Sequence, residues 1–275
     1  MRVRVGHISM QFTDPDRQHT ADITKIFKRA VERRQAWITG TEAGPLSGNT
    51  GEELIRIGKK YGYLLYVPEV EGKEGTAARR ADNWVAVRKD LVKEGTFKQR
   101  FVPVIPSSSD LKEQHPKLPN KQFGPRGVVY VEFDSTNRDL GHVTVMAAHY
   151  LTEARRPSSP WWEWNKKLAQ AISDLAKEKG KGTNLVFYGG DQNMADSKNK
   201  EPQGDTFFGE PLTSTWDELK KWENTGHGCI DVIATYDADK RVKAINTVSL
   251  NDKELFLHTD HFYVEAEIRV APLKR

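Results

Sequence analysis

The apolar positions along the chain follow two periods, and these periods predict a mixture of strands and helices. Residues 2–12 alternate between apolar and polar positions, as a strand with one buried face does. Residues 20–36 have the helical period instead, with an apolar stripe on one side and basic residues on the other. The apolar stripe consists of Ile23, Ile26, Phe27, Ala30 and Val31.

The same two patterns continue to the end of the chain. Further strands are predicted at residues 37–42, 63–67, 83–88, 96–102, 127–134, 142–149, 185–188, 229–235, 242–250 and 262–270. Further helices are predicted at residues 51–61, 161–179 and 216–222, the last one capped by Ser214 or Thr215. Residues 69–82 and the proline-rich residues 103–125 are expected to be loops. Gly189 and Gly190 are expected to turn the chain after the strand that precedes them.

This order of elements favours an α+β fold over a doubly wound parallel sheet. Strict alternation of strand and helix is absent, and many connections have the length of a hairpin. Two mixed β-sheets packed face to face, with helices on the outside, fit the order better. We find no internal repeat and no break in composition, so we expect residues 1–275 to form a single domain.

Composition narrows the class of protein only slightly. Hydrophobic residues make up 37% and charged residues 29%, which is within the globular range. The net charge of +4 is compatible with nucleic acid as a partner but does not require it. A single cysteine, Cys229, excludes an internal disulfide, and no apolar run reaches the length of a membrane span. With no signal peptide evident, we expect a cytoplasmic monomer without a membrane or a protein partner.

Candidate chemistry lies where polar residues directly follow or end apolar strands. A sandwich brings strand ends from distant parts of the sequence to one mouth, so these residues are candidates for a shared site. They are Glu42, His149, Asp191, Asn193, Asp231, Asp260 and His261. Glu42 and Asp260 could hold a hard divalent cation through oxygen ligands. A Cys/His zinc quartet, a phosphate-binding P-loop and a Gly-x-Ser-x-Gly elbow are all absent from the sequence.

Five blocks, in order along the whole chain, resemble the endonuclease/exonuclease/phosphatase superfamily, which has the deoxyribonuclease I-like fold. They are VRVGHISMQF (residues 3–12), ITGTE (38–42), VTVMAAHYL (143–151), VFYGGDQN (186–193), and IDVI (230–233) together with TDH (259–261). The resemblance implies a four-layer α/β-sandwich, with two packed mixed β-sheets flanked by helices. Two departures stand out, because Ser9 occupies a position that usually carries asparagine and Thr259 replaces a serine.

The resemblance also implies a metal-dependent hydrolysis of phosphate esters by an activated water. Glu42 and Asp260, with Gln11 as a third candidate, would bind Mg²⁺ or Mn²⁺. Asp191 and Asn193 would act on the attacking water and on a phosphoryl oxygen. His261, oriented by Asp231, would donate to the phosphate or transfer a proton, and His149 would contact the phosphate or the leaving group. Ser9 and Arg126 are the candidates for further substrate contacts.

The substrate is left open among three classes. Two features favour a nuclease that hydrolyses phosphodiester bonds in DNA rather than RNA. They are the excess of basic over acidic residues and a stretch of basic and aromatic residues after His149. That stretch contains Arg155, Arg156, Trp161, Trp162 and Trp164. The alternatives are a phosphatase or phosphodiesterase for a small-molecule or lipid phosphate, and a non-catalytic nucleic-acid-binding module.

Overall fold

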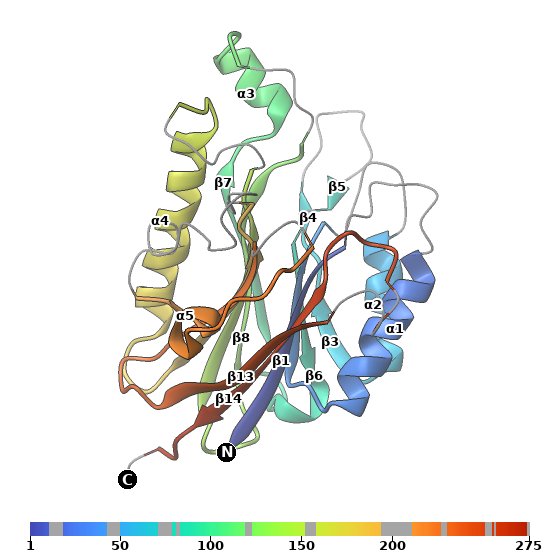
Figure 1. The fold of residues 1–275 in the computed structure, drawn as a ribbon, viewed down its shortest axis with the longest axis vertical. Helices are drawn as coiled ribbons and strands as arrows, with labels where there is room; N and C mark the ends of the chain where they lie inside the picture. The colour runs from blue at the N-terminus through green and yellow to red at the C-terminus, as the bar shows by residue number, and fades with distance from the viewer. Residues whose placement is uncertain are drawn as a thin grey trace.

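Two six-stranded β-sheets pack face to face and carry helices on their outer faces (Figure 1). The computed structural model describes residues 1–10, 19–42, 50–70, 79–80, 83–118, 123–151, 158–193, 211–226, 230–250, 255 and 257–273. This arrangement confirms the four-layer α+β sandwich predicted from the sequence. Within these ranges, none of the helices combines the length and the apolar composition that spanning a bilayer requires.

The strand order gives each sheet the same plan. The strands are β1 (Arg2–Ser9), β2 (Trp37–Thr41), β3 (Tyr63–Tyr66), β4 (Glu69–Val70), β5 (Arg79–Arg80), β6 (Trp84–Arg88), β7 (Lys98–Ile105), β8 (Arg126–Asp134), β9 (His142–His149), β10 (Leu185–Asp191), β11 (Thr213–Ser214), β12 (Asp231–Tyr236), β13 (Val242–Leu250) and β14 (Tyr263–Val270). The first sheet has the order β13-β14-β1-β2-β6-β3, and the second has the order β11-β12-β10-β9-β8-β7. In each sheet the two central strands, β1 with β2 and β9 with β10, are parallel, and all other pairs are antiparallel.

The space between the sheets is filled by side chains from alternate positions of the central strands. Val3 and Val5 of β1 belong to this core, whereas Ile8 belongs to the separate cluster beneath the first two helices. Trp37 of β2 meets Phe187 of β10 across the interface, with 4.4 Å between the ring centroids. The period of two along each strand therefore decides which side chains reach the interface and which reach the helices.

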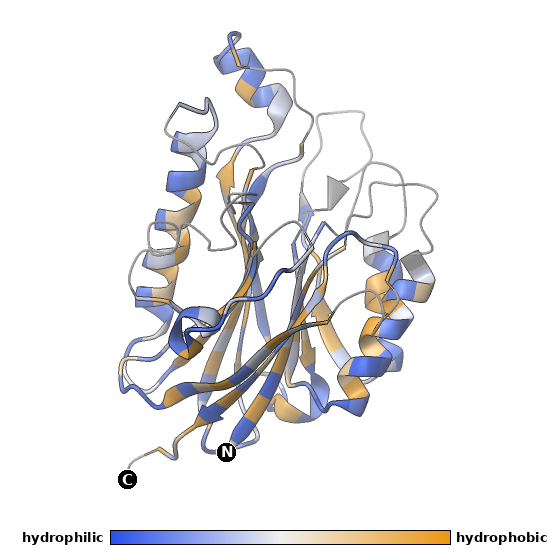
Figure 2. Cartoon of the chain, in the orientation of Figure 1, coloured by the Kyte–Doolittle hydropathy of each residue, from blue (hydrophilic) through white to orange (hydrophobic). Residues whose placement is uncertain are grey.

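The three longest of the described helices are amphipathic and turn their apolar sides towards the sheets (Figure 2). The described helices are α1 (His19–Glu32), α2 (Thr50–Lys60), α3 (Ser108–Gln114), α4 (Trp162–Lys179) and α5 (Thr215–Leu219), with a single 3₁₀ turn, η1, at Lys89–Leu91. The first two cover the first sheet and α4 covers the second. Because each helix buries only one stripe, the outer layers shield both sheets from water while remaining polar outside.

The predicted helix boundaries needed two corrections. The first helix ends at Glu32, not at residue 36, and Arg34 then adopts a left-handed conformation with φ of 52°. Val31, predicted on the apolar stripe, lies within this helix but is 45% exposed. The last helix is also shorter than predicted and begins after Ser214, whose hydroxyl accepts a hydrogen bond from the Trp216 amide.

Two segments that were predicted to be loops contain strands or a helix. Residues 69–82 contain the strand pair β4 and β5, and residues 103–125 contain the end of β7 and helix α3. Pro103 is tolerated within β7 because that strand forms the edge of the second sheet and its register shifts at this point. Ser107 caps α3 by accepting from the Asp110 amide at 3.3 Å, a signal hidden among the prolines of this segment.

The glycine pair before Asp191 was predicted to form a turn, and this prediction is wrong. Gly189 and Gly190 both lie inside β10, which continues to Asp191. A Cβ atom at Gly189 would overlap Thr39 Oγ1, and one at Gly190 would overlap the Tyr188 hydroxyl. These glycines are therefore explained by lack of space and not by conformational freedom.

We expect Gly40→Ala to destabilise the first sheet. Gly40 lies opposite the fully buried Trp84, and a Cβ atom there would overlap the indole ring. Overpacking of this kind costs about 1–3 kcal/mol. Urea unfolding followed by circular dichroism measures the loss, and Gly124→Ala is the matched control because a Cβ atom added there would meet nothing within 4 Å. Equal stability of the two variants would contradict the prediction.

Candidate active site

The four central strands end at one edge of the sandwich, and the candidate residues lie at these ends. Ser9 at the end of β1 pairs in register with Thr41 at the end of β2, and Glu42 follows directly. His149 at the end of β9 pairs with Asp191 at the end of β10. Because both parallel pairs run in the same direction across the interface, residues far apart in sequence meet there (Figure 1).

Asp191 is the centre of this group and is only 1% exposed. Its Oδ2 atom lies 3.4 Å from Ser9 Oγ, 3.5 Å from His149 Nε2 and 3.8 Å from His261 Nε2. Its Oδ1 atom accepts a hydrogen bond from the Asn193 backbone amide at 2.9 Å. A buried carboxylate is costly unless it is paired, and the surrounding hydroxyl, amide and imidazole groups provide that compensation.

Asn193 links Asp191 to the end of β9. Its Nδ2 group donates to the Tyr150 carbonyl at 3.0 Å and lies 2.9 Å from His149 Nε2. The second hydrogen of this amide points to the imidazole, so Nε2 acts as the acceptor. The backbone of Asn193 is left-handed, with φ of 49°, as asparagine tolerates better than most residues. Strained conformations of this kind are concentrated at functional sites.

Asp231 and His261 form a buried ion pair beside Asp191. Asp231 Oδ2 lies 2.7 Å from His261 Nδ1, which is the contact predicted from the sequence. Burial alone would lower the pKa of His261, but the Asp231 carboxylate raises it to about 10. Burial alone would raise the pKa of Asp231, but the positive His261 ring holds it below its usual range. The pair is therefore charged, with His261 Nε2 directed towards Asp191.

Three side chains that the sequence analysis did not single out for the site hold this ion pair in place. Thr225 Oγ1 accepts from the Asp231 amide at 3.2 Å, and Trp216 Nε1 donates to the Asp231 carbonyl at 3.2 Å. Thr259 donates to the Ser9 carbonyl at 2.8 Å and accepts from the His261 amide at 3.2 Å. Thr259 had been noted only as a substitute for serine, and its hydroxyl explains why either residue serves there.

The two carboxylates at the rim of the site are more accessible than Asp191. The Glu42 side chain is 22% exposed and its Oε1 atom lies 3.8 Å from His149 Nε2. The Asp260 side chain is 33% exposed and its Oδ1 atom lies 3.9 Å from His261 Nε2. Glu42 also has a left-handed backbone, with φ of 53°, which turns it away from the strand direction of β2. Both carboxylates thus lie one imidazole away from Asp191, Glu42 beside His149 and Asp260 beside His261.

These oxygen donors fit a hard divalent cation. A second group, Asp191, Asp231 and His261, has ligand atoms within 4.8 Å of one another. Asp231 and His261 are already engaged with each other, and both are almost fully buried. The partly exposed carboxylates of Glu42 and Asp260 therefore suit a cation better than the buried group does.

The remaining predicted residues lie elsewhere or outside the described residues. Arg126 is 8% exposed, and it donates to the Tyr150 carbonyl at 2.6 Å and to the His149 carbonyl at 3.4 Å. It thereby fastens the end of β9, and a phosphate contact by Arg126 stays a prediction. Trp161 is buried and packs edge-on against Phe123. Gln11, Arg155, Arg156 and Cys229 lie outside the described residues.

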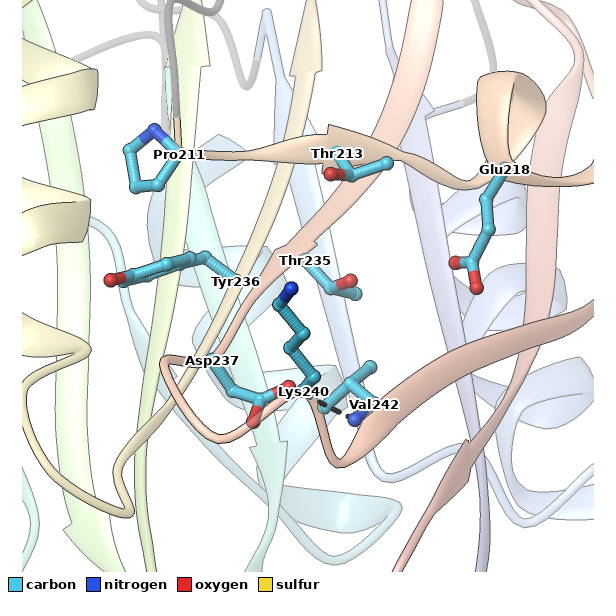
Figure 3. A pocket seen from close by; sticks show the side chains of 8 residues that line it. All are labelled: Pro211, Thr213, Glu218, Thr235, Tyr236, Asp237, Lys240 and Val242. Atoms are coloured by element: carbon cyan, nitrogen blue, oxygen red, sulfur yellow. Dashed lines mark hydrogen bonds between the residues drawn. The ribbon is translucent and has the colours of Figure 1, made fainter.

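A separate cavity of about 320 Å³ lies at the far end of β12 (Figure 3). Asp231 is the first residue of this strand and belongs to the candidate site. Tyr236, the last residue of the strand, and Asp237, which follows it, line the cavity. The Asp237 carboxylate accepts from the backbone amides of Arg241 and Val242 at 2.8 and 2.9 Å. This carboxylate therefore shapes the turn before β13, and the cavity is distinct from the candidate site.

No family model matches the sequence, and no curated protein sequence matches it either. Solved structures match along nearly the whole chain. D. rerio TDP2 complexed with single strand DNA product gives a TM-score of 0.64 at 13% identity, over 98% of this chain and 99% of that chain. An endonuclease/exonuclease/phosphatase from Beutenbergia cavernae DSM 12333 gives 0.65 at 19% identity, over 98% and 72%. The human Nocturnin catalytic domain with bound sulfate anion gives 0.63 at 10% identity, over 98% and 95%.

These similarities establish the fold. The chain has the deoxyribonuclease I-like architecture of endonuclease/exonuclease/phosphatase proteins, as its sequence blocks predicted. The identities are too low to transfer an activity by themselves, so function has to be argued from the site.

We expect the His261 ring to remain protonated at pH 8 in the metal-free protein, since its pKa is raised to about 10. Asp231→Asn removes the negative charge that raises the pKa most, and burial then favours the neutral ring, so His261 should lose its proton at a lower pH than in the unmodified protein. The ¹⁵N chemical shifts of the imidazole, followed against pH in EDTA, measure both states. A neutral His261 at pH 8 in the unmodified protein would rule out the ion pair described here.

Proposed function

We propose that this protein is a metal-dependent phosphodiesterase that hydrolyses phosphodiester bonds in DNA through an activated water. The observation that carries the proposal is the convergence of Glu42, Asp191, Asn193, Asp260 and His261 at the edge of the sandwich where the four central strands end. These side chains come from three separate segments, which are the end of β2, the end of β10 and the residues before β14. Together with His149, their polar atoms form a continuous chain of contacts.

Glu42 and Asp260 are the residues that would hold the cation, Mg²⁺ or Mn²⁺, with Gln11 as a further candidate. Their carboxylates are the more exposed ones of the site, and they supply the oxygen ligands that such cations prefer. When bound, the cation supplies neutralisation of charge on the phosphate and on the leaving oxygen.

Asp191 is placed to accept the proton of the attacking water. Its Oδ1 atom is held by the Asn193 amide, which leaves Oδ2 as the atom directed towards the imidazoles. As the water oxygen attacks phosphorus, its proton passes to Asp191 and the bond from phosphorus to the leaving oxygen breaks. The Asn193 side chain fixes the end of β9 through the Tyr150 carbonyl, so it also limits how Asp191 can move.

His261 is placed to stabilise the charge that accumulates on the phosphate. Its Nδ1 proton is engaged by Asp231, so its Nε2 proton is the one available for a phosphoryl oxygen. A positive ring in a site from which water is largely excluded stabilises a developing negative charge more strongly than it would in water. His149 Nε2 is occupied by the Asn193 amide, so we assign His149 to orienting that amide.

Two observations favour DNA as the substrate. The net charge of +4 suits a polyanion, and one structural neighbour, D. rerio TDP2, holds a single strand DNA product. The test is hydrolysis of supercoiled plasmid and of single-stranded oligonucleotides, each with Mg²⁺ and with EDTA, beside a panel of small phosphate esters. Hydrolysis of the small esters alone would move the substrate to the small-molecule class, and no hydrolysis of any would leave a binding module.

We expect Glu42→Gln to reduce Mg²⁺-dependent hydrolysis by about a hundredfold or more, because it removes a charged oxygen ligand. The fold should persist, since the Glu42 side chain is partly exposed. Turnover at several Mg²⁺ concentrations and the melting temperature are the measurements. Glu267→Gln is the matched control, because Glu267 binds Arg2 and Arg4 at the opposite end of β1. Full activity of Glu42→Gln at low Mg²⁺ would contradict its assignment as a ligand.

We also expect the losses from His261→Ala and Asp231→Asn to overlap. The first should lower turnover by about 10³-fold and the second by less, because both act through one imidazole. The double variant should then be close to His261→Ala alone. A double-mutant cycle on turnover at saturating Mg²⁺ measures the coupling, and strictly additive losses would show that the two residues act independently.

A further inference from the structure

A second imidazole faces the ion pair from the other sheet. His7 lies on β1, is 0% exposed, and shares its side of the strand with Val3 and Val5 in the core between the sheets. Its Nε2 atom lies 3.4 Å from Asp231 Oδ1, the carboxylate oxygen that His261 does not use. Among the described residues, neither atom forms a hydrogen bond of standard geometry, so this 3.4 Å approach is the contact from which a hydrogen bond could form. A buried imidazole in an apolar strand needs such a partner, because an unpaired polar group is costly there.

The neighbour on β2 sets the direction of the His7 ring. Thr39 is the register partner of His7, and Thr39 Oγ1 lies 2.9 Å from His7 Nδ1. If the proton were on Nδ1, the lone pair of Nε2 would face a carboxylate and repel it. The single Thr39 hydroxyl proton can be donated to His7 Nδ1 at 2.9 Å or to the more distant Gly6 carbonyl at 3.4 Å. When Thr39 donates to Nδ1, the ring proton lies on Nε2 and points to Asp231. The second arrangement satisfies all three groups at once.

Space for this arrangement is made by Gly189 on β10. A Cβ atom there would overlap Thr39 Oγ1 and would lie 3.0 Å from His7 Nδ1. The glycine of the second sheet therefore accommodates a histidine and a threonine of the first sheet. None of the roles argued above uses His7 or Thr39, and Gly189 would otherwise lack an explanation within a strand.

We propose that His7 is a positioning residue that holds Asp231 Oδ1 and thereby fixes the direction in which His261 presents its Nε2 proton. Asp231 then accepts from two imidazoles, with His7 on one oxygen and His261 on the other. A carboxylate held at both oxygens cannot rotate about its terminal bond, so the His261 ring stays aligned with Asp191. The consequence for turnover rests on the proposed function, whereas the geometry of the His261 ring does not.

Two substitutions of similar size separate this role from simple core packing. His7→Gln places an amide nitrogen near the position of Nε2 and can still reach Asp231. His7→Asn places its amide near the position of Nδ1, so it keeps the contact with Thr39 and loses the one with Asp231. We expect His7→Asn to lower kcat about tenfold to a hundredfold at unchanged KM, and His7→Gln to remain within about threefold of the unmodified enzyme. Equal losses in both variants, or unchanged kcat in His7→Asn, would overturn the proposal.

A spectroscopic measurement tests the proposed role of His7 independently of enzyme activity. In metal-free protein labelled with ¹⁵N-histidine, His7 should carry its proton on Nε2, and the hydrogen-bonded Nδ1 proton of His261 should give a sharp signal. His7→Asn should broaden or shift that signal, and His7→Gln should preserve it. The first observation needs no variant, so it holds even if His7→Asn fails to fold, and a proton on His7 Nδ1 would overturn the proposal. If no phosphodiester is hydrolysed, the proposed function fails while these spectra still test the role of His7.

Discussion

Two carboxylates, Asp191 and Asp231, are buried next to each other between the sheets, and the rest of the site follows from the need to compensate them. They are register partners on β10 and β12, and both are at most 1% exposed. Two like charges this close would repel strongly in a region of low dielectric constant. The three imidazoles of His7, His149 and His261 lie around them, and each has a ring nitrogen within 3.5 Å of one of the carboxylates. Asp231 is compensated by the charged His261 ring and by the proton that we infer on His7 Nε2, whereas Asp191 accepts from the Asn193 amide and faces the same His261 ring.

The sheets supply the geometry that this compensation needs. The parallel pairs β1 with β2 and β9 with β10 end at the same edge, so their last residues are fixed by backbone hydrogen bonds and not by mobile loops. Contacts then cross the interface, from Ser9 to Asp191 and from His7 to Asp231. A reactive group positioned by a strand end is held more precisely than one on a loop.

The sequence predicted the architecture well because its signals are local and periodic. Strands such as β1, β6 and β7 were predicted from alternation, and the ordered blocks pointed to Asp191, Asn193, Asp231 and His261. The pairing of Asp231 with His261 was also anticipated and is present at 2.7 Å.

What the sequence could not reveal depends on contacts between distant segments. His7 looks like an isolated polar residue in a strand until Asp231 is placed opposite it. The two glycines of β10 look like a turn until Thr39 and Tyr188 are seen to fill the space. Arg126 had the position expected of a phosphate contact, yet its guanidinium binds two backbone carbonyls. For His7, Gly189 and Arg126, a contact with a residue more than twenty positions away determines what the residue does. Gly190 differs, because the tyrosine that limits its space is the nearby Tyr188.

The division of the sheets along the chain has a consequence for folding during synthesis. All six strands of the second sheet come from residues 98–236, so that sheet can form as soon as this stretch has left the ribosome. The first sheet combines β1, β2, β3 and β6 with β13 and β14, and β1 pairs with β14 across more than 250 residues. Loops that long close slowly, which leaves one edge of β1 unpaired in the nascent chain. Thr259 and His261 join the site with this last pairing, so a partly synthesised chain lacks the ion pair of Asp231 with His261, and the candidate site is complete only with the final hairpin.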